Sequence, residues 1–241
     1  MSYQPGQSDF SGSGGYFHNS FDDSGLAAPR SSRGNTVRRG PAPAEHRTFV
    51  PKTNDGGLFA AVGAAVGFVV TIWIVFLVDT FAFSGGLQEY GVQPRTEHGL
   101  WGIIFAPVLH SGYEHITANT VSAAIFTALI AFTSKRLWWQ VTTVVAIVSG
   151  LATWVIGPLG TVHIGASGLV YGWLAFLIVR GFINHALGQI IVGIFLAFSY
   201  SGLIWGVFPT DAPVSWQMHL FGAIGGIIAA FLLKRGRERR A

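Results

Sequence analysis

Long apolar runs with few charges, each about the length of a bilayer-crossing helix, recur along this sequence from residue 57 onward. A run of ~20 apolar residues crosses the hydrocarbon core as a helix, because every backbone polar group must be hydrogen-bonded inside the membrane. Half of the 241 residues are hydrophobic and only 11% are charged. The sequence therefore predicts an all-α polytopic membrane protein.

We expect six transmembrane helices in a domain that covers residues 56–233. Between the first two runs, residues 80–112 are interrupted by Gly and Pro and are too polar to form another crossing. This segment is predicted to be an interfacial loop between helices 1 and 2. The six predicted spans are residues 57–79, 113–133, 138–156, 167–182, 187–208 and 214–233.

The two ends of the chain have the composition of solvated tails. Residues 1–55 are rich in Gly, Ser, Pro, Asn and Arg, with few clustered apolar residues, so we expect a disordered basic tail. The first apolar run begins too late for a cleaved signal sequence. Residues 234–241 form a second, short basic tail. Because the basic residues flank membrane spans, we predict a topological role for them and no nucleic-acid partner.

The distribution of positive charge predicts the orientation. With both termini in the cytoplasm, fourteen of the fifteen Lys and Arg residues lie on the cytoplasmic side, including Lys135 and Arg136 between the second and third spans and Arg180 near the end of the fourth. Only Arg95 lies outside. This asymmetry follows the positive-inside rule, and the compact six-span form is typical of a multi-pass protein of a bacterial cell membrane.

Three polar motifs interrupt the apolar runs. GASGLVYG puts Ser167 at the head of the fourth run, HITAN puts His115 and Asn119 near the start of the second, and HLFGAIGG puts His219 near the head of the sixth. In the predicted topology all of these side chains lie at one depth, toward the outer leaflet. A serine, a candidate base and two oxyanion donors are the groups that acyl transfer requires.

Two glycine pairs support a meeting of the fourth and sixth helices. Gly168 and Gly172 form a GxxxG pattern on the fourth run, and Gly222 and Gly226 form another on the sixth. Small residues at this spacing let two membrane helices approach closely. A serine–histidine hydrogen bond between these helices would need such an approach.

These motifs resemble those of the rhomboid family of intramembrane serine proteases. The family pattern has GxSG at the head of the fourth core helix, HxxxN in the second and HxxGxxxG in the sixth. Here the corresponding stretches are GASG at 165–168, HITAN at 115–119 and HLFGAIGG at 219–226. The resemblance covers residues 57–233 and includes GVQPR at 91–95 in the first long loop.

The resemblance implies a role for each matched residue. Ser167 corresponds to the nucleophile and His219 to its general base, a dyad without a carboxylate, while Tyr171 corresponds to the tyrosine that packs on the catalytic imidazole. His115 and Asn119 correspond to side chains that stabilise the oxyanion together with the Ser167 N–H. We expect a supporting role for one further histidine, His110.

One position departs from the family pattern. Well-studied bacterial members carry a Trp-Arg pair in the first loop, whereas here Trp101 is followed by Gly102. The hydrogen bonds of that arginine are absent, so the sequence does not indicate what holds the loop.

The predicted function is a serine-type endopeptidase that cleaves single-span or polytopic membrane proteins near the outer leaflet of the lipid bilayer. The absence of cysteine excludes thiol catalysis, and the absence of HExxH argues against a metalloprotease, so we predict neither metal nor cofactor. An aspartyl protease would need paired aspartates within its spans. The alternative is a non-proteolytic rhomboid-like protein that binds membrane clients.

Overall fold

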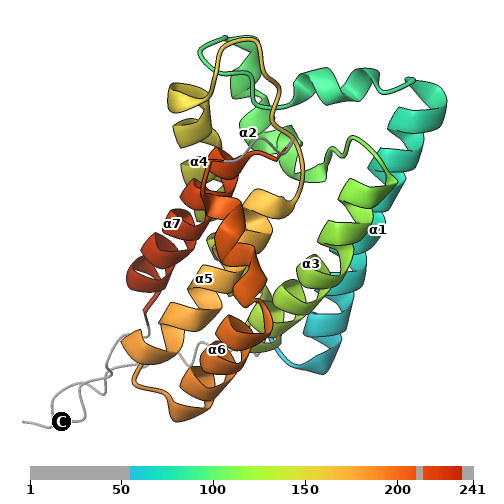
Figure 1. Cartoon of the computed structure of the whole chain (residues 1–241). Helices are drawn as coiled ribbons and strands as arrows, with labels where there is room; N and C mark the ends of the chain where they lie inside the picture. Colours follow the sequence, from blue (N-terminus) through green and yellow to red (C-terminus); the bar gives the residue numbers. More distant parts are fainter. Residues whose placement is uncertain (1–54, 210–213, 235–241) are drawn as a thin grey trace, which may run out of the picture. The chain divides into compact units, whose positions relative to one another are not determined.

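The computed structural model describes residues 55–209 and 214–234, which are helical apart from turns, loops and one isolated pair of bridged residues (Figure 1). The predicted terminal tails lie outside the described residues, except for Asp55 and Lys234. Each predicted span contains a helix at the expected place. The six main helices are α1 (Leu58–Ala82), α3 (Tyr113–Thr133), α4 (Lys135–Ile156), α5 (Ser167–Ile183), α6 (Leu187–Ser199) and α7 (Trp216–Leu232).

Length and composition divide these helices into two groups. α1, α3 and α4 are long and apolar enough to cross a membrane, and α6 with the short helix after it qualifies as a fourth if the bent pair is one span. α5 and α7 have 17 residues each and are shorter. The described chain is thus a helical membrane protein with several spans, and the count of six stays a prediction.

The fifth predicted span is not one straight helix. α6 ends at Ser199, and the 3₁₀ helix η4 (Ser201–Val207) turns away from it by 69°. We expected a continuous helix over 187–208. Ser and Gly on either side of the break weaken helical propensity, and the Tyr171 hydroxyl donates to the Leu203 carbonyl at 2.8 Å, which ties η4 to α5.

The segment between α1 and α3 consists of short helical turns: η1 (Gly86–Tyr90), η2 (His98–Leu100), α2 (Gly102–Phe105) and η3 (Ala106–Val108). We call residues 83–112 the first loop. Its start is fixed by Asp79, a buried side chain in the last turns of α1 that accepts hydrogen bonds from Leu87 N at 2.8 Å and Gln88 Nε2 at 3.2 Å.

The far side of the first loop is held by backbone contact and by one arginine. A Cβ at Gly102 would overlap the backbone of Gly91 and Val92, so only glycine lets α2 lie this close to them. Arg95 donates from Nη1 to the Val155 carbonyl at 2.7 Å, at the end of α4. These contacts replace the Trp-Arg arrangement of the family pattern, because the position after Trp101 has no room for a side chain.

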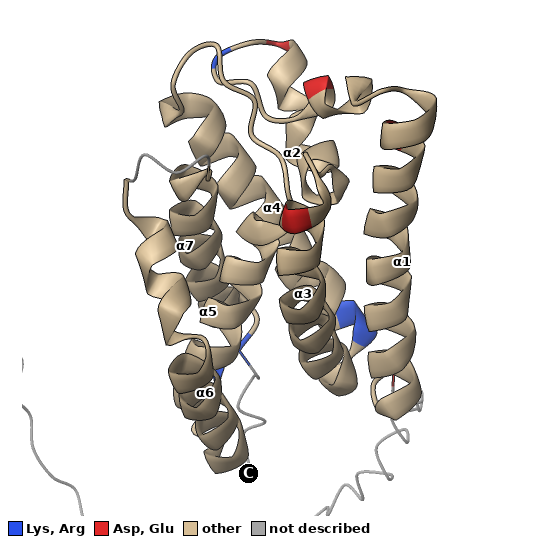
Figure 2. Cartoon of the chain, turned by 45° about the vertical axis from the view of Figure 1, so that its right-hand side comes forward, with Lys and Arg blue, Asp and Glu red and all other residues tan. Residues whose placement is uncertain are grey.

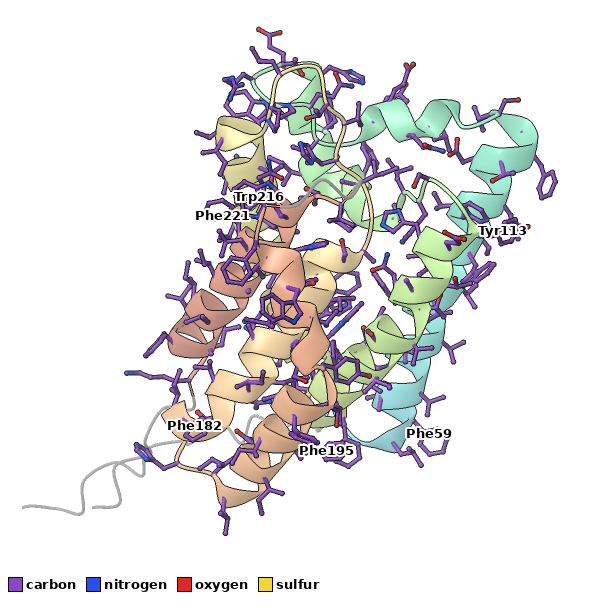
Figure 3. All side chains as sticks on the ribbon, in the orientation of Figure 1. Phe59, Tyr113, Phe182, Phe195, Trp216 and Phe221 are labelled. Atoms are coloured by element: carbon purple, nitrogen blue, oxygen red, sulfur yellow. The ribbon has the colours of Figure 1, made fainter. Side chains whose placement is uncertain are left out.

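Helix α5 packs against α3, α4, α6 and α7, and thus holds the centre of the bundle (Figure 1). Its Trp173 and Phe176 are fully buried, together with Phe126 of α3. In contrast, aromatic side chains such as Phe59 and Phe195 point outward from the bundle (Figure 3) and are 94% and 66% exposed. A large apolar exterior of this kind is expected of a surface that faces lipid.

Candidate active site

The first residue of α5 and the fourth residue of α7 form a hydrogen-bonded pair. Ser167 Oγ lies 2.9 Å from His219 Nε2. On the other side of the ring, His219 Nδ1 lies 2.9 Å from the Gly206 carbonyl oxygen. A carbonyl can only accept, so Nδ1 carries the proton and Nε2 accepts from the serine hydroxyl. This is the tautomer that a general base for Ser167 requires.

The imidazole is also fixed by ring stacking. The rings of Tyr171 and His219 are nearly parallel, with an interplanar angle of 8° and centroids 4.2 Å apart. Because the Tyr171 hydroxyl is bonded to Leu203 in η4, the tyrosine cannot rotate away without losing that bond. His219 is only 7% exposed. The imidazole is therefore held by α5, η4 and α7 together.

Two glycine contacts bring α5 and α7 close enough for this pair to form. A Cβ at Gly222 would overlap the Gly168 carbonyl oxygen, and a Cβ at Gly226 would overlap the Gly172 carbonyl oxygen. The two GxxxG patterns thus face one another, backbone against backbone, directly beyond Ser167 and His219.

The segment that leads into Ser167, residues 163–166, is bonded on both sides; we call it the serine strap. His163 and Val92 exchange two backbone hydrogen bonds of 2.9 Å, and Gly165 N donates to the Ala106 carbonyl at 2.9 Å. Gly165 has φ +118°, which an L side chain rarely adopts. The first loop therefore sets the position of Ser167.

Two histidines lie against the strap. Ala166 N donates to His110 Nε2 at 3.4 Å, and the rings of His110 and His115 are 5.0 Å apart. A Cβ at Gly165 would lie 2.5 Å from His115 Nε2, so this imidazole occupies the space beside the strap. Burial, with a smaller effect of nearby His115, lowers the pKa of His110 to about 4. His110 is therefore neutral at physiological pH.

Asn119 lies one turn further along α3 and is 5% exposed. Its Nδ2 donates to the His115 carbonyl at 2.9 Å, within the same helix. The amide group carries a second N–H, which that bond leaves for another acceptor. The structure thus brings Ser167, His219 and Tyr171 into direct contact, and arranges His110, His115 and Asn119 in a row beside the strap.

Sequence reasoning missed two contributions. The Gly206 carbonyl has no signature, since any residue supplies such an oxygen. The second is the side chain of His163, whose Nδ1 lies 2.7 Å from Ser215 Oγ and whose Nε2 lies 2.9 Å from Thr161 Oγ1. Ser215 is the N-cap of α7 and accepts from Met218 N at 3.4 Å. A serine just before an apolar helix is a recognisable cap signal, although its histidine partner is not.

A family model described as the Rhomboid domain matches residues 97–236. The chain belongs to the rhomboid family. An uncharacterised protein of Mycobacterium tuberculosis is 37% identical over 228 residues, which cover 90% of this chain and 93% of that protein. The putative rhomboid protease YdcA of Bacillus subtilis is 29% identical over 62% of this chain and 76% of its own length. The rhomboid protease GlpG of Haemophilus influenzae is 25% identical over 68% of this chain and 88% of its own length.

This membership and the apolar helices make the chain a multi-pass membrane protein with a rhomboid helical bundle. Among residues 55–209 and 214–234, no group of three or more His, Asp or Glu side chains could hold a metal ion.

Proposed function

We propose that this rhomboid is an intramembrane serine endopeptidase in which Ser167 is the nucleophile and His219 is its general base. The observation that carries the proposal is the 2.9 Å contact between Ser167 Oγ and His219 Nε2, in the tautomer fixed by Gly206. A neutral imidazole that accepts from the hydroxyl is ready to take its proton. No carboxylate is needed to select this tautomer, because the backbone carbonyl does so.

In the proposed reaction Ser167 Oγ attacks the carbonyl carbon of the scissile peptide bond, and its proton passes to His219 Nε2. The resulting imidazolium then gives this proton to the leaving amine as the C–N bond breaks. Water then attacks the acyl-enzyme carbonyl and gives a proton to Nε2. The imidazolium passes this proton to Ser167 Oγ as the ester bond breaks and the carboxylic acid product leaves. Atoms and protons balance without any metal or cofactor.

The oxyanion of the tetrahedral intermediate needs hydrogen-bond donors near Ser167. Helix α5 begins at this residue, and the first N–H groups of a helix have no intrahelical partner and point along a positive helix end. His115 lies beside Gly165, and Asn119 keeps one amide N–H available beyond its bond to His115. We assign the oxyanion to the Ser167 N–H, with His115 and Asn119 as further donors.

We further propose that both termini are cytoplasmic, in the cell membrane, and that the site opens toward the outer leaflet. Figure 2 supports this orientation: acidic residues gather on the first-loop end of the bundle, and most Lys and Arg lie toward the other end. The head of α5 and the first loop lie on the acidic side. The substrate would be a single-span or polytopic membrane protein, one helix of which presents its outer end there.

The rival function is client binding without proteolysis. Two observations disfavour it: both dyad residues are present, and Nε2 accepts from the serine, which a purely structural histidine would not require. Labelling with a fluorophosphonate separates the two functions. The wild-type protein should be labelled covalently, and Ser167→Ala should not be labelled. His219→Ala should also escape labelling, since the hydroxyl then lacks its base.

A second experiment measures cleavage of a single-span substrate that carries a helix-destabilising residue near its outer end. In a soluble serine protease, loss of nucleophile or base costs ~10⁶ in kcat, and the double loss costs little more. Loss of one oxyanion donor costs ~10² to 10³. We expect no cleavage by Ser167→Ala, His219→Ala or the double variant, and residual cleavage by Asn119→Ala. Wild-type cleavage by Ser167→Ala would support client binding instead.

The proposed orientation has its own test. A reporter fused after Ala241 should be cytoplasmic, and a cysteine introduced at Thr210 should react from outside with an impermeant thiol reagent. The reverse pattern would contradict the six-span topology and the outer-leaflet site.

A further inference from the structure

A groove of about 880 Å³ lies between α1 and α4 and is also lined by residues of the first loop. This α1–α4 groove has small residues on one wall, Gly63, Gly67 and Thr71 of α1, and Thr143 and Ile147 of α4 on the other. A Cβ at Gly63 or Gly67 would meet nothing within 4 Å. The protein's own side chains therefore leave this space open, and its volume is that of a ligand pocket (~300–1,000 Å³).

The two ends of the groove differ in chemistry. At one end lie Lys135, which is exposed, and the indoles of Trp138 and Trp139. Trp side chains favour the boundary between headgroups and acyl chains, and a lysine beside them attracts anionic lipid. The nearby Asp55 carboxylate accepts hydrogen bonds from Ser134 Oγ and from the backbone N of Arg136, so this end of the groove carries two cationic residues and one acidic residue. The opposite end is lined by the first loop, through apolar residues such as Ile103 and Ile104, and we call this part of the loop the roof of the groove.

The length of the groove selects its occupant. From Lys135 to Ile147 the α4 wall rises through twelve residues, or about 18 Å at ~1.5 Å per residue. One leaflet of the hydrocarbon core is ~15 Å thick, half of ~30 Å. An acyl chain anchored at Lys135 therefore reaches the roof. A transmembrane helix needs the full thickness and would collide with the first loop halfway, which argues against a second copy of this chain.

We propose that the α1–α4 groove is a binding site for an anionic phospholipid, with one acyl chain between α1 and α4 and the phosphate on Lys135. The acyl chain would support the roof, which belongs to the first loop. In that loop the Ala106 carbonyl accepts a hydrogen bond from Gly165 N of the serine strap. The lipid thus lies under the element that positions Ser167. The site itself does not depend on proteolysis, so its test needs no cleavage.

Native mass spectrometry of the full chain in detergent tests this site, with phosphatidylglycerol and phosphatidylcholine of identical acyl chains as probes. Gly67→Leu places a side chain in the groove from a position where a Cβ meets nothing within 4 Å, and should reduce binding of both lipids at least tenfold. Lys135→Gln should remove the preference for phosphatidylglycerol, a loss of about fivefold, and leave phosphatidylcholine binding unchanged. Gly202→Leu, which also meets open space but on η4, is the matched control.

Three outcomes would overturn the proposal. Lipid adducts of Gly67→Leu equal to those of wild type would mean that the groove is not the site. A preference for phosphatidylglycerol that survives in Lys135→Gln would mean that the phosphate is bound elsewhere. Disulfide-linked dimers formed through a cysteine at Thr143, and lost in Gly67→Leu, would make the groove an interface between copies. Melting temperatures equal to that of wild type would show that both variants fold.

Discussion

The carbonyl of Gly206 accepts a hydrogen bond from Nδ1 of His219, on the side of the imidazole opposite Ser167. In serine proteases with a triad, a buried carboxylate fills this position, selects the tautomer and stabilises the imidazolium. A carbonyl selects the tautomer equally well, but it stabilises the imidazolium only in part, since it carries no charge. It also comes from η4, so the bend after α6 belongs to the proposed catalytic arrangement.

A methyl group at Gly206 should disturb this arrangement. Its Cβ would overlap the Tyr171 hydroxyl and lie 3.1 Å from His219 Nδ1. We expect Gly206→Ala to reduce kcat by ~10²-fold, because ångström shifts of reacting groups have effects of this size. Tyr171→Phe removes the overlapping hydroxyl, so the double variant should recover part of the lost rate. A double variant slower than Gly206→Ala would contradict the steric account; steady-state cleavage measures both.

The contact between α5 and α7 should be equally sensitive. A side chain at Gly222 would overlap the Gly168 carbonyl, so Gly222→Val must separate the helices that carry Ser167 and His219. We expect a loss of activity of ~10²-fold or more, with membrane insertion retained. Gly188→Val is the control, because its Cβ would meet nothing within 4 Å. Full activity of Gly222→Val would mean that the close approach is unimportant for catalysis.

The sequence predicted the helices well, because the length of apolar runs is set by the bilayer and is visible locally. Helix α4 begins at Lys135, three residues before the predicted 138, since Ser134 caps it by accepting from Leu137 N at 3.1 Å. The break at Tyr200 was not predicted. Ser and Gly around residue 200 only weaken the helix, and the bend also depends on a tertiary contact, the bond from Tyr171 to Leu203, which the local sequence does not encode.

For the site, too, the local sequence predicted some features, and others depend on tertiary contacts. Motif spacing on membrane helices predicted that Ser167 and His219 would share one depth, and glycine patterns predicted which helices would touch. The Gly206 carbonyl and the contact of His163 with Ser215 depend on loop conformations, for which periodicity carries no information. Gly102 was noted only as a missing arginine, whereas the structure gives it a steric reason.

His110 should make stability depend on pH. Its pKa falls from an ordinary 6.5 to about 4 in the folded protein, mainly through burial. Between these values the unfolded state binds a proton that the folded state does not, so stability is complete above 6.5 and declines as pH falls toward 4. The loss is on the order of 3 kcal/mol.

Thermal unfolding in detergent at pH 7.5 and pH 4.5 measures this dependence. Burial also lowers the pKa of His163, which adds a contribution of the same sign. In His110→Gln the decline should be smaller than in wild type, although the stability at neutral pH is also lower. An undiminished decline in this variant would assign the pH dependence to other groups.

His163 should act on catalysis through Ser215. Its Nδ1 contact of 2.7 Å joins the serine strap to the N-cap of α7, whose first turn carries His219. This bond fixes the distance between the serine strap, which leads to Ser167, and the start of α7, which leads to His219. A buried neutral hydrogen bond contributes ~1 kcal/mol. We therefore expect His163→Ala and Ser215→Ala each to lower kcat several-fold, with KM unchanged.

A double-mutant cycle measures whether the two residues act as one unit. If they do, His163→Ala combined with Ser215→Ala is hardly slower than either single variant, because the second change removes nothing further. Loss of the N-cap alone would behave differently: it would lower the melting temperature of Ser215→Ala without involving His163. His163→Gln, which keeps a donor and an acceptor, should recover part of the rate. Fully additive effects on kcat would mean that the contact does not set the spacing of Ser167 and His219.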